Sequence, residues 1–191
     1  MPRICLNPGH YIGLDPGAIG NKSTEAELVM DYANLIKPML EKVGYEVTIV
    51  NYNELYQITD ASDQWGADVF VSIHCNSAAS TYAYGTETFY YVDSPNGKKL
   101  ANCIQNQVEP VMREFRILYK NATTKEEKAN IADTSDRGLK TDSLYVVRNT
   151  NAVAALVEIG FISNEMDEEI MIARKIEIAS AIARGISDYY A

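Results

Sequence analysis

The chain has 191 residues, of which 47% are hydrophobic and 23% charged, values typical of one globular domain that can bury a sizeable core. Its formal net charge is −9 and no run of Lys or Arg occurs, which argues against binding to nucleic acid. No segment approaches about eighteen consecutive apolar residues, so we expect no membrane-spanning helix, and no signal peptide is visible ahead of the first strand candidate.

Six short segments predict β-strands. Most are apolar, rich in Val, Ile, Phe or Tyr, and bounded by Gly, Asn, Asp or Ser. They are Arg3–Leu6, Glu46–Val50, Asp68–Ile73, Thr86–Val92 and Ala154–Ile159, with Ser143–Val147 as a sixth candidate.

Segments with apolar residues three and four positions apart lie between the strand candidates and predict amphipathic helices. The first has its apolar face at Leu28, Tyr32, Leu35, Met39 and Val43. A second covers about Lys98–Glu114, and a third has an acidic start near Glu165 and an apolar face that continues to Ile186. The polar segment Asn121–Asp136 predicts an exposed loop or a short surface helix. This alternation of strands and helices favours an α/β fold with a largely parallel sheet.

The chain contains only two histidines, and each lies just past a strand candidate. His10 lies in NPGHYIGLDPGAIG and His74 in ADVFVSIHCNS, while Glu158 is the single charge within the strand candidate ALVEIGF. Ligands of open α/β sheets bind beyond the carboxyl ends of the strands, so we expect these three side chains to lie together. Glu25, at the start of the first helix, can fold back beside His10 through a short loop.

Two imidazoles and one carboxylate are a ligand set typical of catalytic zinc, which keeps a fourth position open for water. A further glutamate then serves as the general base, taking a proton from water and passing it to a leaving amine. Spacing alone leaves alternatives open. Either histidine can be a hydrogen-bonded loop residue, and Glu27 is as available as Glu25.

Three cysteines, Cys5, Cys75 and Cys103, are widely spaced and form no CxxC pair. The spacing predicts free thiols rather than a disulfide framework or a cysteine-based zinc site. Cys75 directly follows His74, but neighbouring side chains on a strand point to opposite faces, so we assign Cys75 to the core.

Six blocks of the sequence, taken in order, resemble the zinc-dependent N-acetylmuramoyl-L-alanine amidases of the amidase_3 family. They extend from about Ile4 to Tyr189 and read NPGHYIGLDPGAIG, STEAELVMDYA, ADVFVSIHCNS, GTETFYY, DRGLK and LVEIGFISN. The resemblance implies that residues 1–191 form a single amidase catalytic domain. It also implies a mixed, mostly parallel sheet of about six strands with helices on both faces.

The resemblance implies one zinc ion per chain, held by His10, Glu25 and His74, and it selects Glu25 over Glu27. It makes Glu158 the catalytic glutamate. The implied reaction is hydrolysis of the amide that joins the lactyl group of N-acetylmuramic acid to the L-alanine of the stem peptide.

Two further residues are candidates for substrate contact. Asn76, two positions beyond His74, either orients the substrate or braces its own loop. Tyr11 either stacks on a sugar or peptide face of the substrate or is an ordinary loop tyrosine.

The sequence departs from the family pattern in places that spare the ligands. Tyr11 and Ile12 stand where the family has a second glycine, and Val153 stands where it has a proline. Some relatives carry a long autoinhibitory helix. The segment Phe115–Asp136 is too short for one, and we do not expect Glu126 or Glu127 to cover the site.

The implied partner is peptidoglycan, through its muramyl peptides, at the bacterial cell wall. No wall-binding repeat is visible, so affinity for the wall comes from the cleft or from a separate wall-binding module. Two alternatives keep the same polymer. One is a zinc peptidase or deacetylase, and the other is a catalytically inactive homologue that binds the wall or regulates an amidase.

Overall fold

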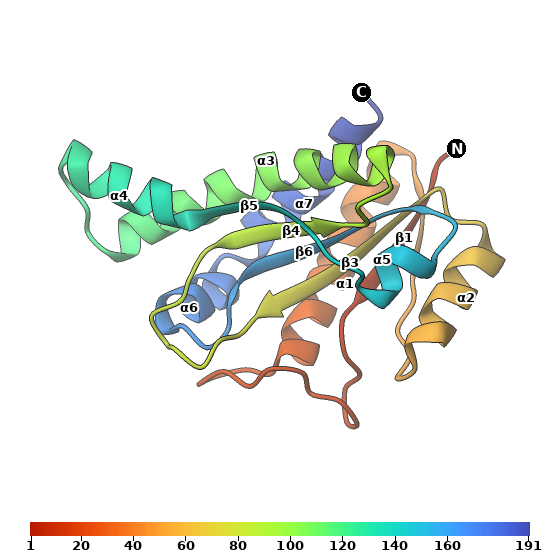
Figure 1. The fold of residues 1–191 in the computed structure, drawn as a ribbon, viewed down its shortest axis with the longest axis horizontal. Helices are drawn as coiled ribbons and strands as arrows, with labels where there is room; N and C mark the ends of the chain where they lie inside the picture. The colour runs from red at the N-terminus through yellow and green to blue at the C-terminus, as the bar shows by residue number, and fades with distance from the viewer.

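The computed structural model describes residues 1–191 as one six-stranded sheet with helices on both faces (Figure 1). The strands are β1 (Arg3–Pro8), β2 (Glu46–Ile49), β3 (Val69–Asn76), β4 (Thr86–Tyr90), β5 (Asp136–Thr141) and β6 (Val153–Phe161). Their order across the sheet is β2-β1-β3-β6-β4-β5. All neighbours are parallel except β4 and β6, which are antiparallel. The predicted mixed, mostly parallel sheet is confirmed.

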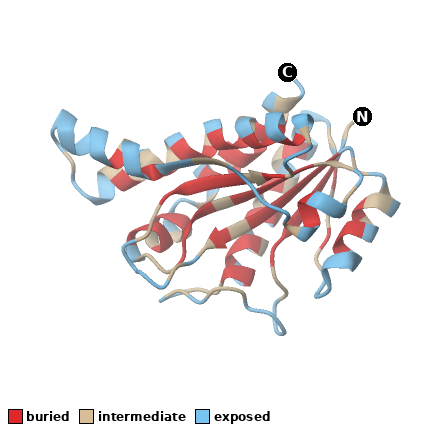
Figure 2. Cartoon of the chain, in the orientation of Figure 1, coloured by how far each residue is buried: buried red, intermediate tan, exposed pale blue.

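The helices cover the two faces of the sheet unequally. They are α1 (Glu25–Val43), α2 (Leu55–Trp65), α3 (Pro95–Tyr119), α4 (Lys125–Ser135), α5 (Tyr145–Asn149), α6 (Glu165–Ala173) and α7 (Lys175–Tyr189). On one face α1, α3, α6 and α7 bury a cluster of 32 residues. On the other face α2 and α5 cover a cluster of only 8. Figure 2 shows the buried strands between helices whose outer faces are exposed.

The core forms because each element presents an apolar face to the sheet. In α1 the predicted face is confirmed at Leu28 and Tyr32, and Ile36 and Leu40 continue it, whereas Val43 is exposed. Fully burying one such aliphatic side chain contributes about 1.5–3 kcal/mol. Cys5 and Cys75 are buried free thiols, and Cys103 is partly exposed, so no disulfide joins them.

One prediction of secondary structure is wrong near the thinly covered face. Ser143–Val147 is not a strand, because Tyr145–Asn149 forms α5 and its Val146 and Val147 pack into the smaller core cluster. The sixth strand is instead β5, an edge strand that pairs with β4. The polar segment before it contains the short helix α4, as predicted.

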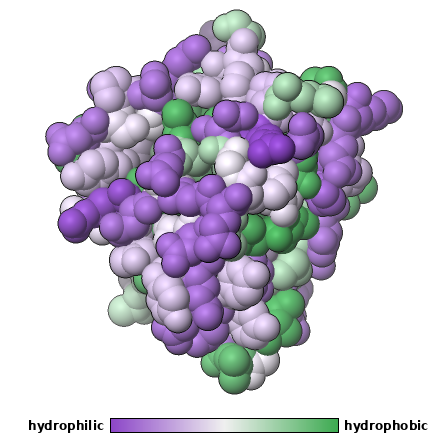
Figure 3. Space-filling model, turned by 90° about the vertical axis from the view of Figure 1, so that its right-hand side faces the viewer, coloured by the Kyte–Doolittle hydropathy of each residue, from purple (hydrophilic) through white to green (hydrophobic).

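Other differences concern the number and length of helices. The helix α2 was not predicted. The third predicted helix consists of α6 and α7, which meet at Arg174. No helix combines the length and hydropathy that a membrane span requires. On the face shown in Figure 3, the hydrophobic patches are separated by hydrophilic residues.

Candidate active site

His10 stands just beyond β1, where the backbone takes an unusual turn. Its φ of 63° lies in the left-handed region, which is uncommon for residues other than glycine. The turn is held by Asn51, whose Nδ2 donates to the carbonyl oxygens of Pro8 at 2.8 Å and His10 at 2.7 Å. The strained backbone is therefore fixed by its neighbours and aims the imidazole across the end of the sheet.

His74 and Glu158 are register partners on the parallel strands β3 and β6. Side chains in register point to the same face of a sheet, so both project from the face that α2 and α5 cover only in part. The prediction that these side chains gather at one end of the sheet is confirmed for His10, Glu25 and His74. One possible ligand atom from each lies within 4.8 Å of the others.

Glu25 joins the two imidazoles through both carboxylate oxygens. Its Oε1 lies 2.9 Å from His74 Nδ1 and accepts from the Cys75 amide at 3.0 Å. Its Oε2 lies 3.1 Å from His10 Nε2 and accepts from the Ala18 amide at 3.0 Å. These two amide hydrogen bonds fix the Glu25 carboxylate between the two imidazoles.

The start of α1 explains why Glu25 and not Glu27 enters the cluster. Thr24 caps the helix, and its side chain accepts from the Glu27 amide while the Glu27 carboxylate accepts from Thr24 in return. Glu27 is thus exposed and occupied by the capping box. Glu25, the first residue of the helix, is buried with 4% of its surface exposed.

The cluster shifts the pKa values of its members in opposite directions. The hydrogen bond with Glu25 raises the pKa of His10 from 6.5 to about 9, and Asp15 adds to this rise. Burial alone would raise the pKa of Glu25, but its hydrogen bonds with His10 and His74 lower it below the usual range. Glu25 is therefore an anion over the whole physiological range, as a metal ligand must be.

Glu158 has a different environment from Glu25. Burial raises its pKa from 4.5 to about 7, although His74 acts in the opposite direction. One carboxylate oxygen, Oε2, is buried without a hydrogen-bond partner. A carboxyl group with a pKa near neutrality can both take up and release a proton at physiological pH, which is the property of a general acid–base.

Comparison with known proteins identifies the family of this chain. The model of the Amidase_3 family, described as N-acetylmuramoyl-L-alanine amidase, matches residues 4–188. The chain belongs to this family.

Curated relatives and solved structures agree with that membership. The chain is 31% identical to the probable cell wall amidase LytH of Staphylococcus saprophyticus, covering 98% of this chain and 58% of the relative. It is also 31% identical to the sporulation-specific N-acetylmuramoyl-L-alanine amidase of Bacillus subtilis, covering 97% of this chain and 65% of the relative. The chain thus spans less than two thirds of the length of either. The catalytic domain of CwlV from Bacillus (Paenibacillus) polymyxa superposes with a TM-score of 0.82 at 27% identity, covering 100% of this chain and 98% of that one.

Asp15 is a member of the site that sequence reasoning missed. Its Oδ2 lies 2.8 Å from His10 Nδ1, the ring nitrogen on the side away from Glu25, and its Oδ1 accepts from the Gly17 amide. A carboxylate behind a ligating histidine orients the ring and selects its tautomer. The signal available was an acidic residue in the same glycine-rich loop, where a short turn pairs Tyr11 with Asp15.

The cluster of His10, Glu25 and His74 can hold a metal ion, and we expect Asp15→Asn to weaken metal binding there by roughly 10- to 100-fold, because an uncharged partner no longer orients the His10 ring or increases its basicity. Competition with a chromophoric chelator measures the change. An affinity equal to that of the unaltered protein would show that Asp15 serves the loop and not the imidazole.

Two glycines allow the imidazoles to approach the backbone closely. A Cβ atom on Gly9 would lie 2.2 Å from the His74 ring. A Cβ atom on Gly17 would lie 2.5 Å from the His10 ring and 2.8 Å from Glu25 Oε2. Gly9 and Gly17 thus form a cradle of backbone around the cluster, which explains two of the four glycines near His10.

The two candidate substrate residues have different surroundings. Asn76 Nδ2 donates to Glu87 Oε1 at 2.6 Å, and its Oδ1 accepts from the Ser77 amide, so Asn76 braces the end of β3. Tyr11 is half-buried, and its backbone exchanges hydrogen bonds with Asp15. A substrate contact by Asn76 or Tyr11 stays a prediction.

Glu127 does not cover the site, as expected. Its carboxylate accepts from the amides of Thr123 and Thr124 at the start of α4. In Figure 1, α4 lies at the far left of the molecule and β1 at the right.

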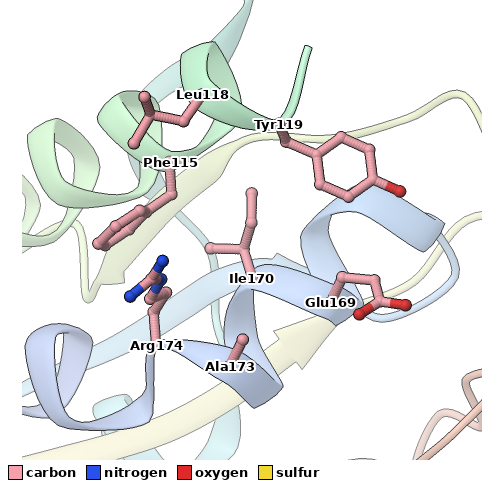
Figure 4. A pocket seen from close by; sticks show the side chains of 7 residues that line it. All are labelled: Phe115, Leu118, Tyr119, Glu169, Ile170, Ala173 and Arg174. Carbon is pink, nitrogen blue, oxygen red and sulfur yellow. The ribbon is translucent and has the colours of Figure 1, made fainter. Parts of the chain in front are cut away.

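The structure has several cavities, and one of them adjoins the two histidines of the cluster. A cavity of about 190 Å³ is lined by His10, Asp15 and His74, and residues of α2 and α5 also line it. Another, of about 250 Å³, lies between α3 and α6 and contains none of the predicted site residues (Figure 4). Its lining residues are Phe115, Leu118, Tyr119, Glu169, Ile170, Ala173 and Arg174.

Proposed function

We propose that residues 1–191 are a zinc-dependent catalytic domain that hydrolyses the amide between the lactyl group of N-acetylmuramic acid and the L-alanine of the peptidoglycan stem peptide. The observation that carries the proposal is the cluster of His10, Glu25 and His74 beside Glu158, in a chain of the amidase family. Four polar side chains from three separate parts of the sequence converge there.

The donor set fits zinc. Two imidazole nitrogens and one carboxylate suit zinc better than magnesium or calcium, which prefer shells of oxygen alone. The backbone cradle of Gly9 and Gly17 leaves the three donors close together, within 4.8 Å. We therefore assign one zinc ion per chain to His10, Glu25 and His74. When bound, zinc polarises a carbonyl group and increases the acidity of water.

Glu158 supplies the proton transfer. Its ionised form accepts a proton from the attacking water, and its protonated form then donates to the nitrogen of the leaving L-alanine. A pKa near 7 makes both steps accessible to one carboxyl group. Asp15 holds the His10 ring in orientation during both steps.

The same proposal includes the place of action. The natural partner is peptidoglycan, so the protein acts at the bacterial cell wall. The chain spans less than two thirds of the curated relatives compared above, and a separate module can supply wall affinity.

The proposal is tested by mass spectrometry of purified peptidoglycan incubated with the protein, with and without a zinc chelator. We expect stem peptides with a free L-alanine amino group, complete loss of these products with the chelator, and recovery when zinc is restored. Metal analysis of the same preparation gives an independent readout, with one zinc ion expected per chain.

Other products would support the alternatives. Cleavage within the stem peptide indicates a peptidase, and release of acetate indicates a deacetylase. An intact wall together with one bound zinc ion per chain would contradict the amidase proposal and favour a binding or regulatory role.

A further inference from the structure

A row of charged side chains crosses the sheet outward from the candidate metal site. His74 on β3 is in register with Glu158 on β6, and Glu158 is in register with Glu87 on β4. Arg137 on the edge strand β5 continues the row, because its Nε donates to Glu87 Oε2 at 3.0 Å. All four therefore lie on one face. In Figure 1 the short helix α5 covers the right-hand part of this face, and β4 and β6 continue beyond it to the left.

Arg137 owes its position to an irregularity in β5. Thr86 pairs with Asp136 and Glu87 pairs with Gly138, so Arg137 is an extra residue between two pairs of the ladder. Gly138 has a φ of 72°, which favours glycine, and its amide donates to Asp136 Oδ1. Such bulges re-aim a side chain and are frequent beside active sites.

The stem of Arg137 is fixed, while the end of its guanidinium group is free. A Cβ atom on Gly85 would lie 2.6 Å from Arg137 Cδ, and the guanidinium carbon lies 4.9 Å from the centre of the Phe161 ring. Of its three nitrogens, only Nε makes a hydrogen bond. The side chain is 39% exposed, and no hydrogen bond occupies Nη1 or Nη2.

Glu87 anchors this arrangement. Its residue surface is 5% exposed, and both carboxylate oxygens are occupied, Oε1 by Asn76 and Oε2 by Arg137. A buried carboxylate is costly without such partners. Arg137 bonds to Glu87 through Nε alone, so its two remaining nitrogens form a planar fork that matches the geometry of an incoming carboxylate.

We propose that Arg137 binds a carboxylate of the stem peptide and so determines substrate specificity. This inference rests on the proposed amidase function. The glycan of peptidoglycan is uncharged at its sugars, whereas the stem peptide carries carboxylates, so a cation on one side of Glu158 marks the side on which the peptide lies. Neighbouring strands are about 4.8 Å apart, so β5 lies about 10 Å from β6. Two to three extended residues span that distance, which places the carboxylate within the first three residues of the stem.

The test compares two synthetic substrates, a muramyl tripeptide with free carboxylates and the same compound with every carboxyl group converted to the amide. The unaltered protein is expected to prefer the free carboxylates by roughly 10- to 100-fold in kcat/KM, the range typical of charge-assisted hydrogen bonds. In Arg137→Met this preference is expected to vanish, with the loss confined to the carboxylate substrate and expressed in KM rather than kcat.

Two further variants make the test specific. Arg137→Lys retains the charge beside Glu87 but has no planar fork, so we expect an intermediate preference. Lys140→Met removes a positive charge from an exposed residue of the same strand, and we expect the full preference to remain. Thermal unfolding of each variant separates loss of fold from loss of recognition.

The outcomes separate this inference from the function on which it rests. If Arg137→Met and Arg137→Lys lose activity equally on both substrates, or keep the preference, Arg137 is not the carboxylate receptor and the amidase proposal stands. If the unaltered protein with zinc releases peptide from neither substrate, the amidase proposal fails, and the specificity inference fails with it.

Discussion

We expect Glu158→Gln to reduce amide hydrolysis by roughly 10²- to 10⁴-fold. In the metal-free protein we also expect the variant to be more stable than the unaltered protein, by an amount that grows as the pH rises. The first effect follows because glutamine has the shape of glutamate but cannot carry the proton. Zinc content is expected to stay at one ion per chain, since Glu158 is not among the clustered ligand atoms.

The stability effect follows from the raised pKa of Glu158. The folded protein holds the Glu158 proton up to about pH 7, whereas the unfolded chain releases it near pH 4.5. As pH rises from 4.5 to 7 the free energy of unfolding of the unaltered protein therefore falls, by about 3 kcal/mol in total. Glutamine does not titrate, so the variant does not lose this stability as the pH rises. The difference in free energy of unfolding between variant and unaltered protein should grow by about that amount across this window and then stay constant.

Urea unfolding of both chelator-treated proteins at several pH values measures this difference. Glu109→Gln is a matched control, because Glu109 is also a buried carboxylate with a pKa raised by burial and one oxygen without a partner. It lies in α3, apart from the cluster, so we expect it to change stability in the same direction and leave hydrolysis unchanged. A Glu158→Gln variant that hydrolyses peptidoglycan normally would remove Glu158 from the mechanism.

Much of the fold could be predicted because its central elements carry strong local signals. The strands β1, β3 and β6 are apolar runs buried in the middle of the sheet, and α1 and α7 have clear apolar faces. The strand β5 has no such signal. Its sequence DRGLKT is largely polar because it lies at an edge, and it becomes a strand only through pairing with β4. In α5 the adjacent β-branched residues Val146 and Val147 are typical of a strand in sequence, but in the structure they belong to a short helix that packs in the smaller core cluster.

The residues of the site likewise differ in whether the local sequence indicates them. His10 lies just beyond β1, His74 lies near the end of β3, and Glu25 begins α1, and each of these elements has a recognisable local signal in the sequence. Asp15, Glu87 and Arg137 are ordinary polar residues in their local sequence. Their importance comes from long-range geometry: Glu87 meets Arg137 fifty residues away and is in register with Glu158. A single sequence holds no record of such pairings.

The second large effect concerns Glu25→Gln, for which we expect zinc affinity at pH 9 to fall by roughly 100- to 1,000-fold. Structural zinc sites gain about 10–16 kcal/mol from four ligands, so one ligand accounts for about 3 kcal/mol. The pH dependence should change as well. In the unaltered protein a proton on His10, with a pKa of about 9, competes with the metal, so affinity rises with pH up to about 9. Without the Glu25 charge the His10 pKa falls toward 6.5, and the rise in affinity should level off at lower pH.

In the metal-free protein, the interaction between His10 and Glu25 affects stability, and this effect decreases as the pH rises. Because the folded pKa of His10 is raised, its contribution to stability is complete below pH 6.5 and is lost as pH rises to about 9. We expect this loss in the unaltered protein and a flatter profile in Glu25→Gln. Glu27→Gln is the matched control, since it removes one carboxylate from the same helical turn but touches only the capping box, at a cost of about 1 kcal/mol or less. If both variants bind zinc equally well, the ligand assignment is wrong. If only Glu25→Gln loses the metal, the capping box of α1 explains physically how the sequence distinguishes two glutamates that stand two positions apart.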